Sequence, residues 1–493
     1  MLKIDIDNII FELRAHGVSE DKIKEVELAY EIAEDIHKNQ TRESGEPYII
    51  HPLHVAKNVL DMEIYDPDTI CAALLHDTIE DAEKKFTKED IAYELNPTIA
   101  ELVDGVTKMR RMKFDTKDQQ NLANTRKIIN GLTKDVRIIF IKLADRLHNM
   151  ETLEYKKTEK RVENAKETMT LFVPIALGLG AYKLKNKLED SSLMYIAPDD
   201  YKRILEERNK LEEKQLPYLQ VMAENIRRHL DNEKIKNNIE FRHQTVNTLY
   251  KKIQKGYEIK NIYDTCYFKV LVPEKKDCYY TIYLIHSMYK PINGRFKDYI
   301  GNPRTNNYQS LHTTITDSNG DSKKIKVRTF DMNKIAGFGI PAYWNLDPER
   351  GGKTIEETQI LINNNLPIAK QLKEIDETAH DDEEFYKDVF SDVLTPSHVY
   401  VYTAGGAIQE LPKHSTAMDF VCQVYGSELD RVTGVLINGR EVPLNQELKN
   451  NDRVEIRTDG KIKQENWESY AITAKAKQKI KQYNERSKKN KEN

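Results

Sequence analysis

Hydrophobic residues recur at helical spacing through residues 1–190. Val26, Ala29, Tyr30 and Ala33, for example, follow the i, i+3, i+4, i+7 pattern of an amphipathic helix. Prolines, which end helices or occupy their first turn, fall at positions 47, 52, 67 and 97. The alternation typical of strands does not appear before residue 240. We therefore predict an all-α domain over residues 1–195.

Strand patterns begin after residue 240. Residues 262–272 are rich in β-branched and aromatic side chains, and residues 311–316 and 324–329 predict two further strands. Ser318-Asn319-Gly320, between the last two, is a favourable hairpin turn. Because helical stretches flank these strands, we predict an α+β domain over residues 196–345.

The C-terminal part has three segments. Residues 346–390 predict a partly helical linker with eight acidic residues between Glu374 and Asp388, which favours a solvated segment over a binding tail. Short strands around the hairpin signal at Asn438 and Gly439 predict a small β-rich domain over 391–460. The tail at 461–493 carries ten basic and four acidic residues. A helix that touches phosphate and a solvated end both fit this tail.

Composition limits the class of protein. The chain has 493 residues, which at about 150 residues per domain favours three domains. Its 76 Lys and Arg nearly balance 80 Asp and Glu, and the net charge of −4 excludes a protein whose whole surface is basic and binds nucleic acid.

Four scattered cysteines argue against a disulfide framework. No apolar run approaches the roughly 20 residues that span a bilayer, and no signal peptide is visible, so we expect a cytoplasmic protein without a membrane partner.

Two histidines and two aspartates form the strongest chemical pattern. They are His51, the adjacent pair His76 and Asp77, and Asp145. Both aspartates follow strongly apolar stretches, where an unpaired carboxylate is costly and a shared cation removes that cost. Mixed imidazole and carboxylate ligands suit Mn²⁺ or Fe²⁺. The pattern therefore favours a divalent metal site, although each residue alone could be an ordinary polar side chain of a helical domain.

Helical spacing extends this cluster. Glu80 lies three residues after Asp77 and four after His76, so we expect all three on one helix face. Asp145 and Asn149 are likewise four residues apart.

Longer strings in the chain resemble a known family. The pattern H…HD…D is that of HD-superfamily metal phosphohydrolases, and SGEPYIIHPLHVA, AALLHDTIEDA, LVDGVTK and IKLADRLHNMETL resemble the hydrolase domain of RelA/SpoT homologues, which make and degrade (p)ppGpp. GRFKDYI and NNYQSLHTT resemble the family's nucleotidyltransferase-like synthetase domain. ELPKHSTAMDFV and INGREVPL resemble its β-grasp-like TGS domain. The resemblance covers nearly the whole chain in family order and implies these three folds.

The resemblance also assigns roles in the hydrolase domain. It implies that one Mn²⁺ is bound by His51, His76, Asp77 and Asp145. It further implies that a pair of acids positions the attacking water or handles its proton, and that three polar residues hold the nucleotide. The acids are Glu80 and Asp81, and the polar residues are Arg42, Ser44 and Asn149. One departure from many members is Glu43, where a basic residue is usual.

The synthetase-like domain departs from its family at the residues that carry chemistry. Asp264 matches one Mg²⁺ ligand of the family, but the second carboxylate is replaced by Lys324. Further departures lie at Gln244, Lys269, Gly337 and Tyr343. Mg²⁺ binding and synthesis are therefore not expected. Six pocket residues remain, either as structural remnants or as a regulatory nucleotide site: Arg242, Asp264, Arg295, Lys297, Tyr308 and His312.

We accordingly predict a Mn²⁺-dependent (p)ppGpp 3′-pyrophosphohydrolase that releases pyrophosphate and GDP or GTP, with an inactive synthetase domain. One alternative is a bifunctional synthetase and hydrolase. A second is a non-catalytic sensor that contacts the ribosome or tRNA through its TGS domain. Tyr425 replaces a histidine frequent in the family's first TGS helix, which weakens this second alternative. A nucleotide or protein that regulates the hydrolase would be a further partner.

Overall fold

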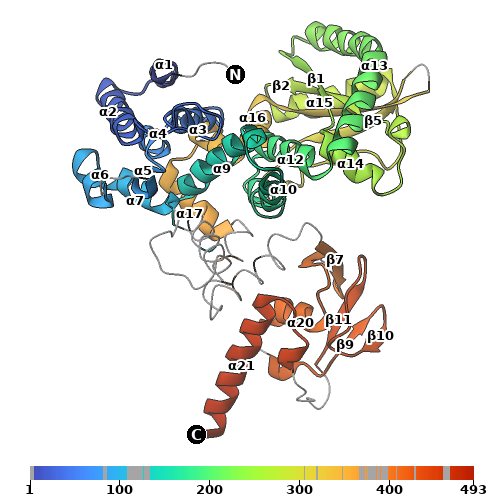
Figure 1. The fold of residues 1–493 in the computed structure, drawn as a ribbon. Helices are drawn as coiled ribbons and strands as arrows, with labels where there is room; N and C mark the ends of the chain where they lie inside the picture. Colours follow the sequence, from blue (N-terminus) through green and yellow to red (C-terminus); the bar gives the residue numbers. More distant parts are fainter. Residues whose placement is uncertain are drawn as a thin grey trace. The chain divides into compact units, whose positions relative to one another are not determined.

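The first part of the chain is helical, as predicted (Figure 1). Its helices are α1 (Ile6–Ala15), α2 (Glu20–His37), α3 (Ile50–Leu60), α4 (Pro67–Leu74), α5 (Thr78–Asp81), α6 (Lys88–Glu94), α7 (Pro97–Val106), α9 (Val136–Glu151), α10 (Thr158–Glu167), α11 (Val173–Gly178) and α12 (Tyr182–Ile196). A 3₁₀ turn at Leu153–Tyr155 follows α9, and a π-helical turn at Thr168–Phe172 joins α10 to α11.

This computed structural model describes residues 5–81, 86–107, 126, 131, 134–304, 306–317, 320–346, 348–365, 372, 375, 385, 389, 398–406, 408–426, 429–458 and 467–492. The chain divides into two compact units, Met1–Thr107 with Phe140–Ile360, and Lys108–Ile139 with Leu361–Asn493. Within the described ranges, no helix is both long enough and apolar enough to cross a membrane.

The apolar periodicity and the prolines that predicted helices have the expected roles in the structure. In α2 the periodic residues Val26, Ala29 and Ala33 are buried. Pro67 and Pro97 each occupy the first turn of a helix, where a missing N–H costs nothing. The preceding residues, Asp66 and Asn96, cap these helices by accepting backbone N–H bonds.

One expectation about helix continuity is wrong. His76 and Asp77 do not share a helix with Glu80, because α4 ends at Leu74 and α5 begins at Thr78. The backbone N–H and the hydroxyl of Thr78 both donate to the Leu75 carbonyl, at 3.0 and 2.7 Å, which closes a turn between the two helices. The metal-type residues therefore lie in a tight turn rather than along one face.

The following region combines helices with a mixed sheet. Its helices are α13 (Pro198–Asn232), α14 (Val246–Ile253), α15 (Lys275–Met288), α16 (Phe330–Phe338) and α17 (Ile355–Asn365), and its strands are β1 (Asn238–His243), β2 (Cys266–Val272), β3 (Lys290–Pro291), β4 (Lys297–Asp298), β5 (Leu311–Thr316) and β6 (Ser322–Thr329). The sheet order is β1-β2-β6-β5-β3, with β4 also paired to β5. Among the described strands of this sheet, β2 and β6 pair in parallel and the other pairs are antiparallel.

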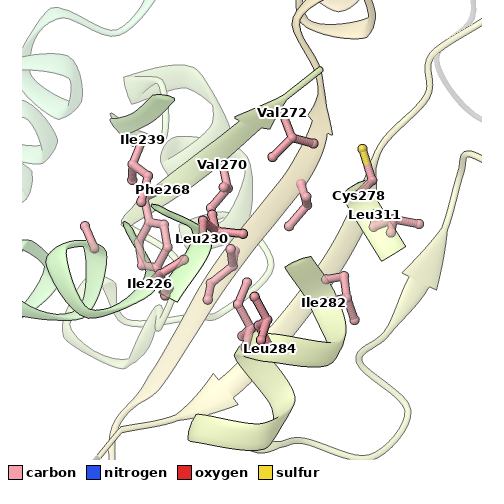
Figure 2. Close-up of a cluster of buried hydrophobic side chains, with 14 of the residues drawn as sticks. Ile226, Leu230, Ile239, Phe268, Val270, Val272, Cys278, Ile282, Leu284 and Leu311 are labelled. Atoms are coloured by element: carbon pink, nitrogen blue, oxygen red, sulfur yellow. The ribbon is translucent and has the colours of Figure 1, made fainter. Parts of the chain in front are cut away.

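One face of this sheet is hydrophobic and packs against α13 and α15 (Figure 2). Phe268 and Val270 of β2 meet Ile226 and Leu230 of α13 and Ile282 of α15 in one cluster. Because strand side chains alternate, the residues between these point to the opposite, polar face.

The strand predictions are confirmed for 311–316, while two others shift. β6 begins at 322 instead of 324, and β2 begins at Cys266 rather than 262, because a 3₁₀ turn at Ile259–Asn261 delays the extended backbone. Asp264 therefore lies in the turn before the strand. Two residues of the predicted hairpin turn, 318 and 319, lie outside the described residues.

The second unit contains a five-stranded sheet of order β10-β9-β11-β7-β8. Its elements are β7 (His398–Thr403), β8 (Ile408–Pro412), α20 (Ala417–Tyr425), β9 (Gly434–Ile437), β10 (Arg440–Val442), β11 (Arg453–Arg457) and α21 (Ala474–Glu492). The predicted hairpin is confirmed, since Asn438 and Gly439 join β9 to β10 with φ of 53° and 79°.

The C-terminal tail forms a helix over Ala474–Glu492, part of which is structural, and its contact with phosphate stays a prediction. Ile480 and Tyr483 of α21 pack in one hydrophobic cluster with Phe420 of α20, so the core continues past the predicted boundary at 460. Tyr425 also packs against this cluster. Most of the acidic stretch at 374–388 lies outside the described residues.

A backbone-to-backbone contact joins α16 to the turn between α11 and α12. Gly339 has φ of 72°, and a Cβ built there would lie 2.2 Å from the Leu179 carbonyl oxygen and 2.7 Å from the Gly180 carbonyl carbon. Ile340 donates to the same Leu179 oxygen at 3.3 Å. No side chain separates the two segments, so only glycine fits.

We therefore expect Gly339→Ala to lower the thermal unfolding midpoint by about 5 °C or more, because it combines a left-handed backbone with a clash against fixed backbone atoms. Gly337→Ala, two residues earlier inside α16, is the control. Its Cβ meets only the flexible end of Lys183 at 3.2 Å. Equal midpoints for the two variants, measured by differential scanning fluorimetry, would contradict this account of the contact.

Candidate functional site

Four buried side chains converge on one point in the helical region. The Nε2 of His51 lies 3.2 Å from the Nε2 of His76, 3.6 Å from an oxygen of Asp77 and 3.4 Å from an oxygen of Asp145. The Nε2 of His76 lies 3.3 and 4.0 Å from the same two oxygens. None of the four residues is more than 8% exposed. Two nitrogens and two carboxylate oxygens thus face one small volume.

Three separate segments bring these residues together. His51 lies in the first turn of α3, His76 and Asp77 lie in the turn between α4 and α5, and Asp145 lies in α9. Asp77 accepts a hydrogen bond from the Tyr48 hydroxyl at 2.7 Å, which orients its carboxylate. The cluster therefore depends on tertiary packing and not on one helix face.

The outer nitrogens of both imidazoles are hydrogen-bonded. His76 Nδ1 lies 2.8 Å from the Ala73 carbonyl, so it carries the hydrogen. His51 Nδ1 lies 2.7 Å from His148 Nδ1, which also lies 3.0 Å from Arg42 Nη1. Because arginine only donates, His148 Nδ1 is the acceptor and His51 Nδ1 carries the hydrogen. Both Nε2 atoms are then left with lone pairs toward the cluster, as metal-ligating histidines require.

The charges at the cluster also favour a cation. Burial lowers the pKa of His51 to about 4, which keeps its ring neutral. Burial alone would raise the pKa of Asp145, but its contact with His51 and the charge of Lys142 bring the pKa well below its ordinary value. Burial alone would lower the pKa of His76, but the contacts with Asp77 and the charge of Asp145 together outweigh it, so the pKa is raised. Two buried carboxylates thus draw positive charge to this point, which a divalent ion supplies.

The other predicted hydrolase residues lie at different distances from the cluster. Asn149 donates to Asp145 at 2.5 Å and accepts from Arg42 Nη2 at 3.0 Å, so both join the site. Ser44 instead donates to Glu46 at 3.2 Å, in the neighbouring loop. The side chains of Glu80 and Asp81 lie outside the described residues.

Within the α+β region, Asp264 is surrounded by cationic and amide groups. Lys252 of α14 lies 2.5 Å from one carboxylate oxygen, and Lys324 of β6 lies 3.0 Å from the other. Gln244 donates to that second oxygen at 3.1 Å. Burial alone would raise the pKa of Asp264, but Lys324 and then Lys252 outweigh it, so the pKa lies below its ordinary value. The carboxylate is already neutralised by the protein.

The remaining residues of this pocket are held by neighbours in the protein. Tyr308, only 8% exposed, bonds His312 at 2.8 Å, with ring contacts to Tyr182 and Tyr299. Burial, together with Lys326 and other nearby cations, lowers the pKa of His312 to about 2.

The outer residues of this pocket are more exposed. Arg295 stacks on Tyr263 at 4.6 Å, Arg242 pairs with Glu240 at 2.8 Å, and Lys297 is exposed on β4. Among the departures from the family, Lys269 bonds Asn333 of α16 at 2.9 Å, and Gly337 faces Lys183 of α12.

Three family models match successive parts of the chain. They are the HD domain over residues 29–182, the region found in RelA / SpoT proteins over 241–349, and the TGS domain over 399–458. A protein of Aquifex aeolicus named guanosine-3′,5′-bis(diphosphate) 3′-pyrophosphohydrolase is 34% identical over 98% of this chain and 67% of its own length. The chain belongs to the RelA/SpoT family.

Other RelA/SpoT proteins carry different names. The bifunctional (p)ppGpp synthase/hydrolase SpoT of Escherichia coli K12 is 36% identical over 94% of this chain and 65% of its own length. A GTP pyrophosphokinase of Myxococcus xanthus is 34% identical over 92% of this chain and 59% of its own length. The chain therefore spans 59–67% of the length of these three relatives. The predicted fold classes agree with membership in the family.

Membership in the RelA/SpoT family explains the first cluster. An HD domain implies a divalent metal, and His51, His76 and Asp77 form a group whose ligand atoms all lie within 4.8 Å of one another. Asp145 completes the set through its contacts with both histidines. The residues present fit such an ion in number, ligand type and orientation.

Sequence reasoning missed several supporting residues of these RelA/SpoT sites. His148 lies three residues after Asp145, so helical spacing could have placed it on the same face. The bond from Tyr48 to Asp77 and the ion pair of Lys252 with Asp264 had no comparable signal, because they join different elements.

Divalent metal binding can be tested with a change that keeps the shape of the site. Asp145→Asn removes one charged ligand, and we expect it to weaken Mn²⁺ binding about tenfold or more. Mn²⁺ at about 100 times its dissociation constant should stabilise the wild type by about 2.7 kcal/mol. Thermal shift titration of both proteins measures the difference. The matched control Asp199→Asn, at the exposed start of α13, should titrate like wild type, and an Asp145→Asn protein that does the same would refute the ligand assignment.

Proposed function

We propose that this protein is a Mn²⁺-dependent (p)ppGpp 3′-pyrophosphohydrolase whose synthetase domain is inactive. Water cleaves the bond between the 3′ oxygen and the pyrophosphate, so ppGpp gives GDP and pyrophosphate, and pppGpp gives GTP and pyrophosphate. The observation that carries this proposal is the contrast between its two carboxylate sites. The cluster around His76 presents ligand lone pairs to a cation, whereas Asp264 is already paired with Lys252 and Lys324.

In the hydrolase site, His51, His76, Asp77 and Asp145 would hold the ion. When bound, Mn²⁺ lowers the pKa of a coordinated water and polarises the phosphoryl group. Arg42 keeps further N–H groups beyond its bonds to His148 and Asn149, and these suit phosphate oxygens. From the family resemblance, we assign Glu80 and Asp81 to the positioning and deprotonation of the attacking water. Ser44 is assigned to nucleotide contact on the same basis.

Lys324 supports the loss of synthesis. Pyrophosphoryl transfer from ATP needs Mg²⁺ on the triphosphate, held by carboxylates. Two unit charges 4 Å apart interact by about 4 kcal/mol at an effective dielectric constant near 20, so a lysine at this position repels an ion that a glutamate would attract. Lys252 contacts the other carboxylate oxygen of Asp264, and Gln244 shares the first oxygen with Lys324.

The bifunctional alternative takes its support from the name of the E. coli relative. It requires Mg²⁺ to displace two lysines from one buried aspartate, which the charges do not favour. A non-catalytic sensor would not need the metal-type ligands around His76. We therefore favour the hydrolase.

The proposal predicts activity in one direction only. Purified protein with Mn²⁺ should release pyrophosphate from ppGpp, and the same protein with ATP, GDP and Mg²⁺ should form no ppGpp. His76→Ala should reduce hydrolysis at least a thousandfold, because it removes both a ligand and the packing of the turn. Thin-layer chromatography of labelled nucleotide measures both reactions.

His229→Ala serves as the control, since this histidine of α13 is exposed and its side chain bonds the Asn225 carbonyl of its own helix. It should hydrolyse ppGpp at the wild-type rate. Robust ppGpp formation would overturn the inactive-synthetase part of the proposal, and undiminished hydrolysis by the His76 variant would overturn the metal part.

A further inference from the structure

The buried ring of His148 receives hydrogen bonds from two parts of the hydrolase site through one nitrogen. Its Nδ1 lies 2.7 Å from Nδ1 of the metal-type ligand His51 and 3.0 Å from Nη1 of Arg42. Arginine only donates, so this nitrogen carries no hydrogen, and its single lone pair serves both donors. The other ring nitrogen, Nε2, is buried and has no hydrogen-bond partner among the described residues. Nδ1 is therefore the polar atom through which His148 acts on its neighbours.

Two imidazoles of α3 hold the ring of His148 in place. The ring is nearly parallel to that of His54, with 4.5 Å between centroids and 10° between planes. It also stacks on His51, at 5.0 Å and 24°. Because His51 and His54 are three residues apart, they lie on the same face of α3. All three histidines are buried, so packing sets the direction of the lone pair on Nδ1.

Arg42 joins the two α9 residues that share a helix face with Asp145. Its Nη1 donates to His148, and its Nη2 donates to Asn149 Oδ1 at 3.0 Å. Asn149 in turn donates to Asp145 at 2.5 Å, and His148 accepts from His51. Each terminal nitrogen of the guanidinium is therefore one residue away from a different metal-type ligand. The nucleotide roles implied by the family resemblance fall on Arg42 and Asn149, and His148 is not among them.

We propose that His148 is a positioning residue that fixes a metal ligand and the phosphate-binding arginine through one shared acceptor. The bond from His51 Nδ1 keeps the hydrogen on this outer nitrogen and leaves the Nε2 lone pair toward the cluster. The bond from Arg42 fixes one arm of the guanidinium, which sets the direction of its remaining N–H groups. Metal binding and nucleotide binding should therefore weaken together when this acceptor is lost.

Two substitutions of His148 separate a role as acceptor from a role in packing. Phenylalanine keeps a planar ring that can stack on His54, but it offers no acceptor. Asparagine loses the ring, but its amide oxygen lies as many bonds from Cα as Nδ1 of histidine does, and it has two lone pairs, one for each donor. A packing role predicts that the phenylalanine variant is the less damaged of the two. The shared-acceptor role predicts the opposite order.

Mn²⁺ titration followed by thermal unfolding, without nucleotide, tests the metal part of the inference. His148→Phe should raise the Mn²⁺ dissociation constant about tenfold or more, the usual cost of losing the partner of a metal-ligating histidine. His148→Asn should stay within about threefold of wild type, because it keeps an acceptor. His148→Leu is a second variant without an acceptor and should match His148→Phe. The unfolding midpoint before metal is added reports any loss of packing separately.

Steady-state hydrolysis of ppGpp at saturating Mn²⁺ tests the nucleotide part, which rests on the proposed function. The KM of His148→Phe should rise about fivefold or more, because Arg42 loses one of its two anchors. The KM of His148→Asn should lie within about threefold of wild type. His16→Phe is the matched control for both measurements. This exposed histidine at the end of α1 stacks on Tyr65 and lies 2.8 Å from the Glu12 carbonyl, so the same substitution there should change neither value.

The inference fails on any of three results. The first is an unchanged Mn²⁺ dissociation constant in both His148→Phe and His148→Leu. The second is a His148→Asn protein as impaired as His148→Phe, and the third is a shift in only one of the two values, the Mn²⁺ dissociation constant or KM. A wild type that does not hydrolyse ppGpp would instead refute the proposed function and with it the nucleotide part, while the Mn²⁺ titration would still decide the metal part.

Discussion

A buried carboxylate needs positive charge beside it, and the two polar sites of this chain meet that need in opposite ways. In the helical region, Asp77 and Asp145 face two histidines whose ring nitrogens present lone pairs. In the sheet region, Asp264 is held by Lys252 and Lys324. The first arrangement is completed by an ion, and the second is complete in the protein itself.

The difference between the two carboxylate sites comes from a turn in the helical region and from strand alternation in the sheet. A turn closed by Thr78 separates His76 and Asp77 from the helix that follows, so both side chains face α3 and α9. In the sheet, strand alternation places Lys324 on the same polar face as Lys326 and leaves Ile325 for the core. A single substitution on a strand therefore changes the charge of the pocket and leaves the hydrophobic packing unchanged.

Local patterns in the sequence predicted much of this arrangement. Helical periodicity identified α2, Gly439 identified a hairpin, and the residues of the cluster around His76 were identified by their type and their apolar neighbours. The break between α4 and α5 was missed because a hydrogen bond to a carbonyl three residues earlier overrides helix spacing there. The contact of His51 with His148 was missed because 97 residues separate them.

The central claim is that one chain holds one divalent ion. The most direct measurement is metal content per chain by elemental mass spectrometry, after dialysis against Mn²⁺ and Mg²⁺ together. We predict one ion on wild type and none on His76→Ala, because Asp264 is already neutralised by its lysines. Two ions on wild type, with one retained by His76→Ala, would contradict the account.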